Sequence, residues 1–204
     1  MKSFKVFAFV ACALAGLAFT SCNDDDDNTL SSQERQEAFQ KVKGNYTGEL
    51  IYASVNPNDT KDQADTVSVS WQIGTDSVMT IQNIPAIAVA RNITDTIIRK
   101  AVAAQPAQDM KCYIGFFGLT PPRFLVNPTG LTYEVSYSNK LGEEPKTHKV
   151  QVLFLANNMY SQGYYEQDKN RLTMQLVEAA IYVDGTYQSG LLSQNYGLRF
   201  QGKR

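Results

Sequence analysis

The chain has 204 residues, of which 43% are hydrophobic and 19% are charged, and its 19 basic and 20 acidic residues give a formal net charge of −1. This length suits one globular domain. The near-neutral charge argues against a nucleic-acid-binding protein, because a surface that neutralises phosphates needs an excess of basic side chains.

The first 21 residues have the pattern of a secretory signal peptide. Lys2 and Lys5 supply positive charge, and an uncharged, mainly apolar stretch runs from Val6 to Phe19. A membrane-spanning helix needs about 20 apolar residues, and this stretch is shorter. We therefore expect a leader that is removed rather than a permanent membrane span.

Residues 18–22, Ala-Phe-Thr-Ser-Cys, resemble the lipobox of bacterial lipoproteins, in which a small residue precedes the lipid-modified cysteine. The resemblance implies that Cys22 is lipidated and becomes the first residue of the mature chain. Several acyl chains hold a protein firmly at a membrane without a spanning helix. The alternative is ordinary secretion after cleavage near residues 13–15, Ala-Leu-Ala.

An acidic run follows this cysteine and resembles the export signal that carries lipoproteins of gut Bacteroidetes to the outer face of the outer membrane. The run consists of Asp24, Asp25, Asp26 and Asp27. The resemblance implies a surface-exposed, lipid-anchored outer-membrane protein with residues 22–32 as an acidic tether. Calcium binding is the weaker alternative, because consecutive side chains do not easily direct about six to eight oxygens at one ion.

The cysteines and the histidine predict neither a disulfide within the mature domain nor a metal site. Cys12 lies in the leader and Cys22 is the lipid site, so Cys112 is the only thiol left in the folded domain. A single histidine, His148, and the absence of a Cys-x-x-Cys motif argue against a zinc or redox centre. We expect no cofactor.

The mature domain begins with a predicted helix and continues as strands. Residues 31–34, Ser-Ser-Gln-Glu, form a capping box that starts a helix through Val42, and Gly44 ends it. Alternating apolar and polar residues then predict antiparallel strands, most clearly at 66–73 and 131–138. Further strands are predicted at 45–54, 77–83, 111–118, 146–155, 159–167, 171–183 and 196–201.

Two segments interrupt the regular alternation. The strand at 171–183 changes phase near Leu176, which indicates a bulge or bend, and Asp184-Gly185 predicts a hairpin turn. Residues 85–104 have apolar side chains at spacings of three and four, with Arg91, Asp95 and Arg99 on the other side. They predict one inserted amphipathic helix with ion pairs on its polar face. Loops are predicted at 105–110, 121–122, 127–130 and 139–145.

These elements predict a mainly β single domain over residues 33–204, most simply an antiparallel β-barrel, with a β-sandwich as the alternative. Residues 43–50, Lys-Gly-Asn-Tyr-Thr-Gly-Glu-Leu, resemble the Gly-x-aromatic first strand of lipocalin-like (calycin) domains. The whole chain also resembles uncharacterised surface lipoproteins of gut Bacteroidetes of similar length. The resemblance implies a lipocalin-like barrel.

The sequence contains no nucleotide-binding or hydrolase motif, and we predict no catalytic residues. His148 and Cys112 have the chemistry of a base and a nucleophile. The more ordinary interpretation is a strand-end histidine and a buried thiol, because Cys112 alternates with Ile114 and Phe116. A carboxylate-based hydrolase would need two acids to converge in space. The candidate acids, each in a predicted strand, are Glu49, Glu134, Glu166 and Glu178.

Tyrosines are the stronger candidates for contacts with a ligand or partner. A tyrosine offers a flat apolar face and a hydroxyl group, which suits stacking on sugars or on a protein surface. The candidates are Tyr160, Tyr164, Tyr165, Tyr182, Tyr187 and Tyr196. The alternative is that these residues simply pack within strands, which favour tyrosine.

Three tripeptides resemble the O-glycosylation signal of Bacteroidetes, in which an aspartate and a hydroxyl residue precede an apolar residue. Their hydroxyl residues are Thr66, Ser77 and Thr96.

We therefore expect a non-enzymatic surface lipoprotein that binds a small hydrophobic or glycan ligand, with no nucleic-acid partner. The alternatives are an accessory subunit of an outer-membrane complex and, less favoured, the hydrolase.

Overall fold

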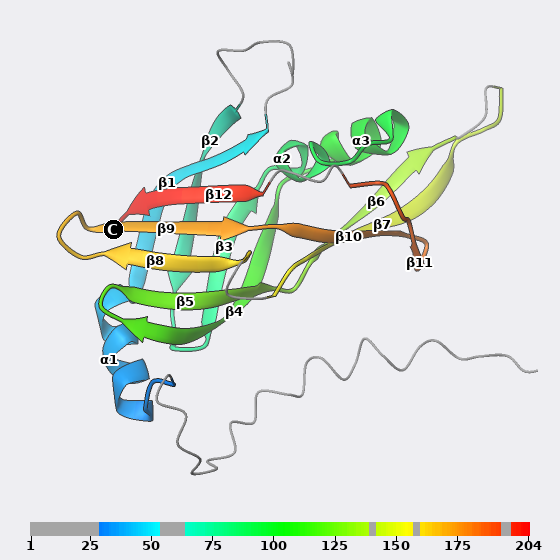
Figure 1. The fold of residues 1–204 in the computed structure, drawn as a ribbon. Helices are drawn as coiled ribbons and strands as arrows, with labels where there is room; N and C mark the ends of the chain where they lie inside the picture. Colours follow the sequence, from blue (N-terminus) through cyan, green and yellow to red (C-terminus); the bar gives the residue numbers. More distant parts are fainter. Residues whose placement is uncertain (1–28, 54–63, 139–141, 157–159, 193–196) are drawn as a thin grey trace, which may run out of the picture.

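The computed structural model describes residues 29–53, 64–138, 142–156, 160–192 and 197–204 (Figure 1). Cys22, the four aspartates of the acidic run and Tyr196 lie outside the described residues.

Eight antiparallel strands form a closed barrel, which confirms the predicted fold class. The barrel strands follow one another around the wall in chain order, and the last pairs with the first. This is the up-and-down arrangement, in which closure leaves no unpaired sheet edge. The strands are β1 (Gly44–Ala53), β2 (Ala64–Ile73), β3 (Val78–Ile84), β4 (Gln108–Leu119), β5 (Pro122–Pro128), β8 (Gln162–Glu166), β9 (Arg171–Leu176) and β12 (Leu198–Lys203).

Two hairpins leave the barrel and pair with each other as a second, four-stranded sheet. One hairpin, β6 (Leu131–Tyr137) and β7 (Lys146–Phe154), is inserted between β5 and β8. The other, β10 (Glu178–Val183) and β11 (Thr186–Tyr187), is inserted between β9 and β12. Strands β7 and β10 pair in the middle, and the sheet extends from the barrel on the side away from the first helix (Figure 1).

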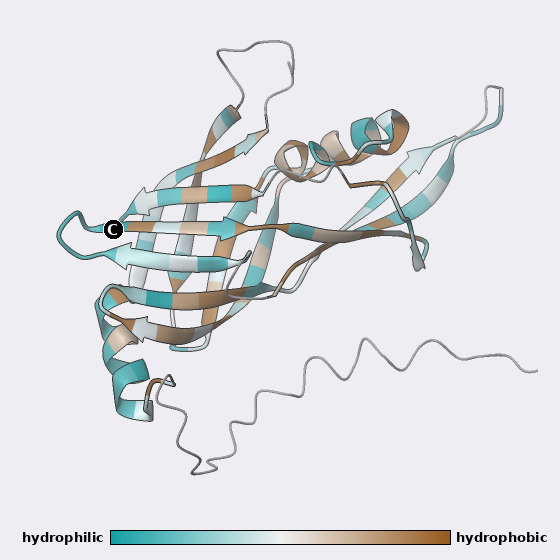
Figure 2. Cartoon of the chain, in the orientation of Figure 1, coloured by the Kyte–Doolittle hydropathy of each residue, from teal (hydrophilic) through white to brown (hydrophobic). Residues whose placement is uncertain are grey.

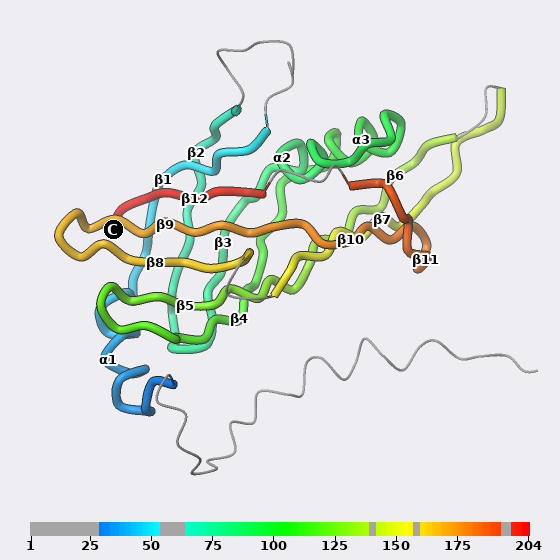
Figure 3. The backbone as a smooth tube through the Cα atoms, in the orientation of Figure 1, coloured from blue at the N-terminus to red at the C-terminus, as the bar shows by residue number. Residues whose placement is uncertain are grey.

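The predicted strand at 171–183 is wrong as a single strand. The chain passes from β9 into β10 without an intervening loop (Figure 3), but β9 pairs with β8 and β12, whereas β10 pairs with β7. The phase change near Leu176 marks this transfer between sheets. A register shift between Glu178 and Ala180 follows directly. The sequence therefore indicated the position of the irregularity, but the structure shows a transfer of the chain from one sheet to another rather than a bulge within one strand.

Strand β5 was not predicted. The prolines at its two ends led to predicted loops at 121–122 and 127–130, and only four residues remained between these loops. Pro122 and Pro128 stand at the two ends of β5, where a missing N–H costs least. Between them Phe124 and Val126 point inward and are fully buried. Similarly, β4 begins at Gln108, inside the predicted loop at 105–110.

The helix predicted at 85–104 is two helices, α2 (Ala86–Ala90) and α3 (Thr96–Ala103). Asp95 is the N-cap of α3 and accepts hydrogen bonds from the backbone N–H groups of Ile97 and Ile98, so it does not continue a single helix. The predicted ion pairs are also wrong. Arg91 instead approaches Asp65 at 3.9 Å, and the Arg99 guanidinium donates to the carbonyl of Ile93.

Helix α1 (Ser32–Val42) lies at one end of the barrel (Figure 1) and confirms the predicted capping box. The Glu34 N–H donates to Ser31 Oγ, and Glu34 Oε2 accepts from the Ser31 N–H at 2.8 Å. Ala38 and Val42 are fully buried, and the Tyr46 hydroxyl donates to the Val42 carbonyl at 2.5 Å. The helix is therefore fixed to the barrel at its last turn.

Aromatic rings fill the inside of this end of the barrel. Tyr46 stacks on Trp71 with ring centroids 5.7 Å apart, and Phe200 and Tyr165 meet these two rings edge to face. Gly202 makes room for Trp71, because a Cβ atom there would lie 2.5 Å from the indole. Hydrophilic and hydrophobic residues alternate along the barrel strands (Figure 2), as expected for a wall with a packed inner face and a solvated outer face.

Candidate functional site

A hollow of about 460 Å³ lies on the outer wall of the barrel across β5, β8, β9 and β12. We call it the outer hollow. Its lining combines an aromatic ring, two arginines and several uncharged polar side chains. The lining residues are Pro121, Arg123, Gln162, Tyr164, Thr173, Met174, Gln175 and Arg199.

Strand register brings these residues together. Arg123, Tyr164 and Thr173 are neighbours on β5, β8 and β9. One step along, Gln162, Gln175 and Arg199 are neighbours on β8, β9 and β12. Residues two apart on a strand share a face, so both rows point outward from the filled barrel. Thr173 has the shortest of these side chains and is only 6% exposed, which places it at the floor of the hollow.

Most polar side chains of the outer hollow have no partner among the described residues. No hydrogen bond or ion pair within the described chain engages the side chains of Arg123, Gln162, Tyr164, Thr173 or Arg199. Tyr164 is 36% exposed, so part of its ring is open to solvent. The hollow thus offers an aromatic face and a set of uncommitted hydrogen-bonding groups, which is the composition of a site for a polar ligand.

The structure separates the six tyrosines that the sequence singled out. Tyr164 lines the outer hollow, and Tyr160 lies beside it, because Gln175 Nε2 donates to the Tyr160 carbonyl at 3.2 Å. Tyr165 faces the opposite way and is buried at 1% exposure in the barrel core. Tyr182 and Tyr187 contact each other on the second sheet, with ring centroids 5.7 Å apart.

No motif or pattern in the sequence singles out Arg123, Gln162, Gln175 or Arg199. Each is a long polar side chain on an outward strand position, which is ordinary on a barrel surface. Only the register across four strands makes them neighbours, and β5 itself was not predicted. The weak signal was that Gln162 and Tyr164 lie on one face of a predicted strand.

A second hollow of about 560 Å³ lies on the outer wall across β1, β2 and β3. The described residues of its lining include no aromatic and no basic side chain. The Ser70 hydroxyl donates to Gln82 Oε1 there at 2.8 Å, so part of the polar lining is already engaged. The lining residues are Thr47, Gly48, Glu49, Ser68, Val69, Ser70, Gln82 and Asn83. The outer hollow is the better candidate for recognition.

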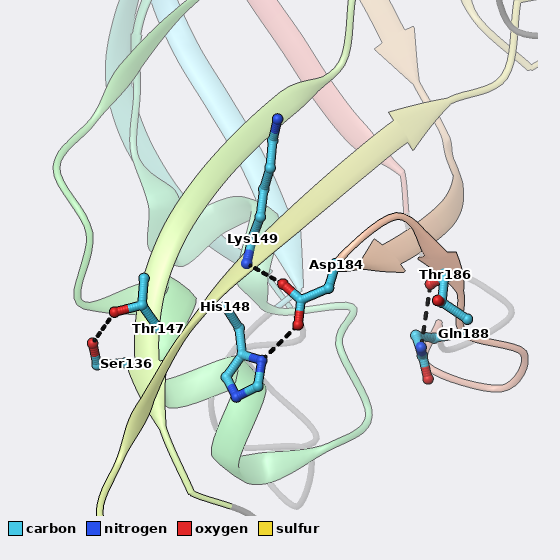
Figure 4. Close-up of polar contacts among 7 residues, drawn as sticks. All are labelled: Ser136, Thr147, His148, Lys149, Asp184, Thr186 and Gln188. Atoms are coloured by element: carbon cyan, nitrogen blue, oxygen red, sulfur yellow. Dashed lines mark hydrogen bonds and ion pairs between the residues drawn. The ribbon is translucent and has the colours of Figure 1, made fainter. Parts of the chain in front are cut away.

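His148 and Cys112 lie in different sheets. Cys112, on β4 in the barrel, is fully buried, and burial raises the pKa of its thiol. His148, on β7 in the second sheet, places Nδ1 2.8 Å from Asp184 Oδ2, at the β10–β11 turn (Figure 4). It stacks on Tyr137 with ring centroids 4.3 Å apart. These contacts give the two residues separate structural surroundings and no shared site.

The four candidate carboxylates lie on four different strands, β1, β6, β8 and β10, and no two of these strands pair with each other. Glu166 binds Lys169 and Arg171, and these hydrogen bonds lower the pKa of its carboxyl. Glu178 is buried, which raises the pKa of its carboxyl to about 8, whereas the side chain of Asn92 acts in the opposite direction. The groups that act on Glu166 and Glu178 are therefore basic or amide side chains, and neither carboxyl is paired with a second candidate acid.

The structure also gives the positions of the three candidate O-glycosylation residues and bears on membrane spans and metal sites. Thr66, Ser77 and Thr96 are all exposed, on β2, in the turn before β3 and at the start of α3. In the described part of the chain, no helix has the length and apolar character that a membrane crossing requires. Among the same residues, no group of three or more His, Cys, Asp or Glu side chains is placed to hold a metal ion.

Comparison with known proteins identifies one family. A family model described as "Domain of unknown function (DUF4840)" matches residues 41–183. The match extends from the last turn of α1 to the end of β10 and includes Arg123, Gln162, Tyr164, Thr173 and Gln175 of the outer hollow, whereas Arg199 lies beyond it. Neither the curated proteins nor the solved structures give a match. Since the family model covers most of its length, the chain belongs to the DUF4840 family of domains of unknown function.

Proposed function

We propose that the protein is a lipid-anchored, surface-exposed outer-membrane lipoprotein whose domain binds a glycan, without catalysis, in the outer hollow. The single observation that carries the proposal is the convergence of unengaged polar side chains around the exposed face of Tyr164. Sugars present hydroxyl groups around apolar ring faces. A tyrosine ring flanked by amide and hydroxyl groups complements both.

A glycan on the wall is favoured over a hydrophobic ligand in the barrel. Tyr46, Trp71, Tyr165 and Phe200 occupy one end of the interior, and all four rings are at most 1% exposed. Tyr46 also packs under Arg204, whose guanidinium lies 6.0 Å from the ring centroid and donates to the Lys43 carbonyl. A ligand at this end would have to displace several packed rings, which costs several kcal/mol.

The cellular address rests on the leader. Cys22 within the lipobox-like sequence and the acidic run after it support anchoring in the outer membrane and export to the cell surface. A binding domain on such a tether would meet soluble or cell-surface glycans directly.

Binding of oligosaccharides to the full-length protein in detergent tests the proposal. A panel of neutral and acidic oligosaccharides is titrated by calorimetry against the wild type, Tyr164→Ala and Tyr187→Ala. Tyr187 is the matched control, because it is 56% exposed but lies on β11, outside the hollow. We expect saturable binding that Tyr164→Ala weakens at least tenfold and that Tyr187→Ala leaves unchanged. No binding by any panel member, or equal binding by both variants, would overturn the proposal.

A further inference from the structure

Among the residues that the structure describes, those lining the outer hollow carry two positive charges and no negative one. They include Arg123 and Arg199 but no Asp or Glu. The nearest acid along β8 is Glu166, two residues beyond Tyr164, and its carboxylate is bound by Lys169 and Arg171. The two arginines are therefore free to attract an anion, whereas the nearby carboxylate is already neutralised.

The arginines stand on opposite sides of the hollow. Arg123 is on β5 and Arg199 is on β12, with β8 and β9 between them. Neighbouring strands lie about 4.8 Å apart, so the two backbones are separated by roughly 14 Å across the wall. Tyr164 and Gln162 on β8 and Thr173 and Gln175 on β9 fill the space between. This layout suits an extended ligand with charges along its length better than one small ion.

Guanidinium groups favour particular anions. The planar fork of an arginine binds carboxylate or a similar oxyanion through two parallel hydrogen bonds, and such charge-assisted bonds are about twice as strong as neutral ones. The central tyrosine, threonine and glutamines add uncharged recognition of the kind that sugar rings and hydroxyls need. A purely electrostatic anion site would not need them.

We infer that the outer hollow selects acidic glycans, whose carboxylate or sulfate groups bind Arg123 and Arg199 while a sugar ring lies on Tyr164. This inference rests on the proposed function and assigns the class of ligand to the same site. It distinguishes two kinds of contact: Tyr164 contributes to the binding of any sugar, whereas the arginines contribute only when the sugar is charged.

Matched oligosaccharides separate these contributions. The full-length protein is titrated with tetragalacturonate, with its methyl-esterified, uncharged form, and with a κ-carrageenan tetrasaccharide, which carries sulfate groups but no carboxylate and so distinguishes sulfate from carboxylate recognition. The variants are Arg123→Gln, Arg199→Gln and Tyr164→Ala. Lys203→Gln is the control, because Lys203 is an exposed cation on β12 that does not line the hollow.

We expect at least one acidic oligosaccharide to bind at least tenfold more tightly than the methyl ester and to weaken as salt is raised. Each arginine variant should lose about tenfold in affinity for that acidic ligand and leave the methyl ester unaffected, and Lys203→Gln should change neither. Equal affinities for acidic and esterified forms, with Tyr164→Ala weakening both, would overturn the charge selectivity and leave the proposed function standing. Absence of binding by every oligosaccharide would overturn both.

Discussion

His148 and Asp184 join two hairpins that are far apart in the sequence. Nδ1 of the imidazole on β7 lies 2.8 Å from Oδ2 of the aspartate that begins the β10–β11 turn (Figure 4). The other carboxylate oxygen accepts the Lys149 backbone N–H at 2.8 Å, and the Asp184 N–H donates to the Lys149 carbonyl at 2.9 Å. Asp184 therefore fixes the turn to the middle of the second sheet at three points.

The charge of Asp184 should stabilise the fold in a pH-dependent manner. The hydrogen bonds from Lys149 N–H and His148 hold the pKa of its carboxyl below its ordinary value of 3.8. A lowered folded-state pKa gives stability that is present above the unfolded value and is lost as pH falls through the folded value. We expect Asp184→Asn to lower the urea midpoint at neutral pH, and the difference from wild type to shrink below about pH 4.

Asparagine isolates the charge, because it tolerates the left-handed backbone at this position, where φ is 51°. Asp76→Asn, in an exposed turn before β3, is the control and should leave the midpoint unchanged at every pH. A constant gap between wild type and Asp184→Asn down to acidic pH would contradict the prediction.

Glu178 should have the opposite pH dependence. Burial raises its pKa to about 8, so the folded protein holds a proton that the unfolded chain, with a pKa near 4.5, releases. Stability from this group is complete below the unfolded value and is lost as pH rises to the folded value. The slope is about 1.4 kcal/mol for each pH unit over that range.

Glu178→Gln removes the ionisation and keeps the size and polarity of the side chain. We expect the variant to be more stable than wild type at pH 9 and to lose that advantage at pH 5, as measured by urea unfolding. Glu134→Gln changes an exposed carboxylate on β6 and should leave the pH profile of wild type intact. Parallel profiles for Glu178→Gln and wild type would show that the buried group does not titrate in this range.

Lipid anchoring gives a prediction that depends on the leader alone. Cells fed a labelled fatty acid should label the wild-type protein and the Cys112→Ala variant but not Cys22→Ala. Cys112→Ala is the matched control, because its thiol is buried in the barrel. Replacing the run Asp24 to Asp27 with asparagines should preserve labelling and make the domain inaccessible to protease added to intact cells. Labelling that persists in Cys22→Ala would contradict the anchor.

Local sequence signals predicted the fold better than the site. The capping box at Ser31 and Glu34, the alternation in β2 and β6 and the Asp184-Gly185 turn each depend on neighbours in sequence, and each is confirmed. Barrel closure followed from the number of strands and the cost of open edges. The second sheet was not foreseen, because nothing local distinguishes a strand that stays in the barrel from one that pairs elsewhere.

The outer hollow depends on register, which the sequence does not display. Tyr164 was selected for its chemistry, yet its neighbour Tyr165 was selected for the same reason and is buried. The alternation on β8 predicts that Tyr164 and Tyr165 point to opposite faces of the sheet, but it does not predict which face packs in the core. Arg199 joins the site only because β12 returns beside β9, so its role requires the assembled barrel.

Gly202 leaves room for the Trp71 ring inside the barrel, and this close approach gives a direct test of the packing. A Cβ at Gly202 would lie 2.5 Å from the Trp71 ring and 2.5 Å from the Thr47 carbonyl oxygen, whereas a Cβ at Gly115 on β4 meets nothing within 4 Å. Overpacking a core costs about 1–3 kcal/mol. We expect Gly202→Ala to lower the free energy of unfolding by about that amount and Gly115→Ala to leave it nearly unchanged.

Trp71 is the only tryptophan in the chain, so its fluorescence should report the disturbed ring in Gly202→Ala alone. Equal stability of the two variants would mean that space beside Trp71 is available, and a ligand within the barrel would then become a credible alternative to one on its outer wall.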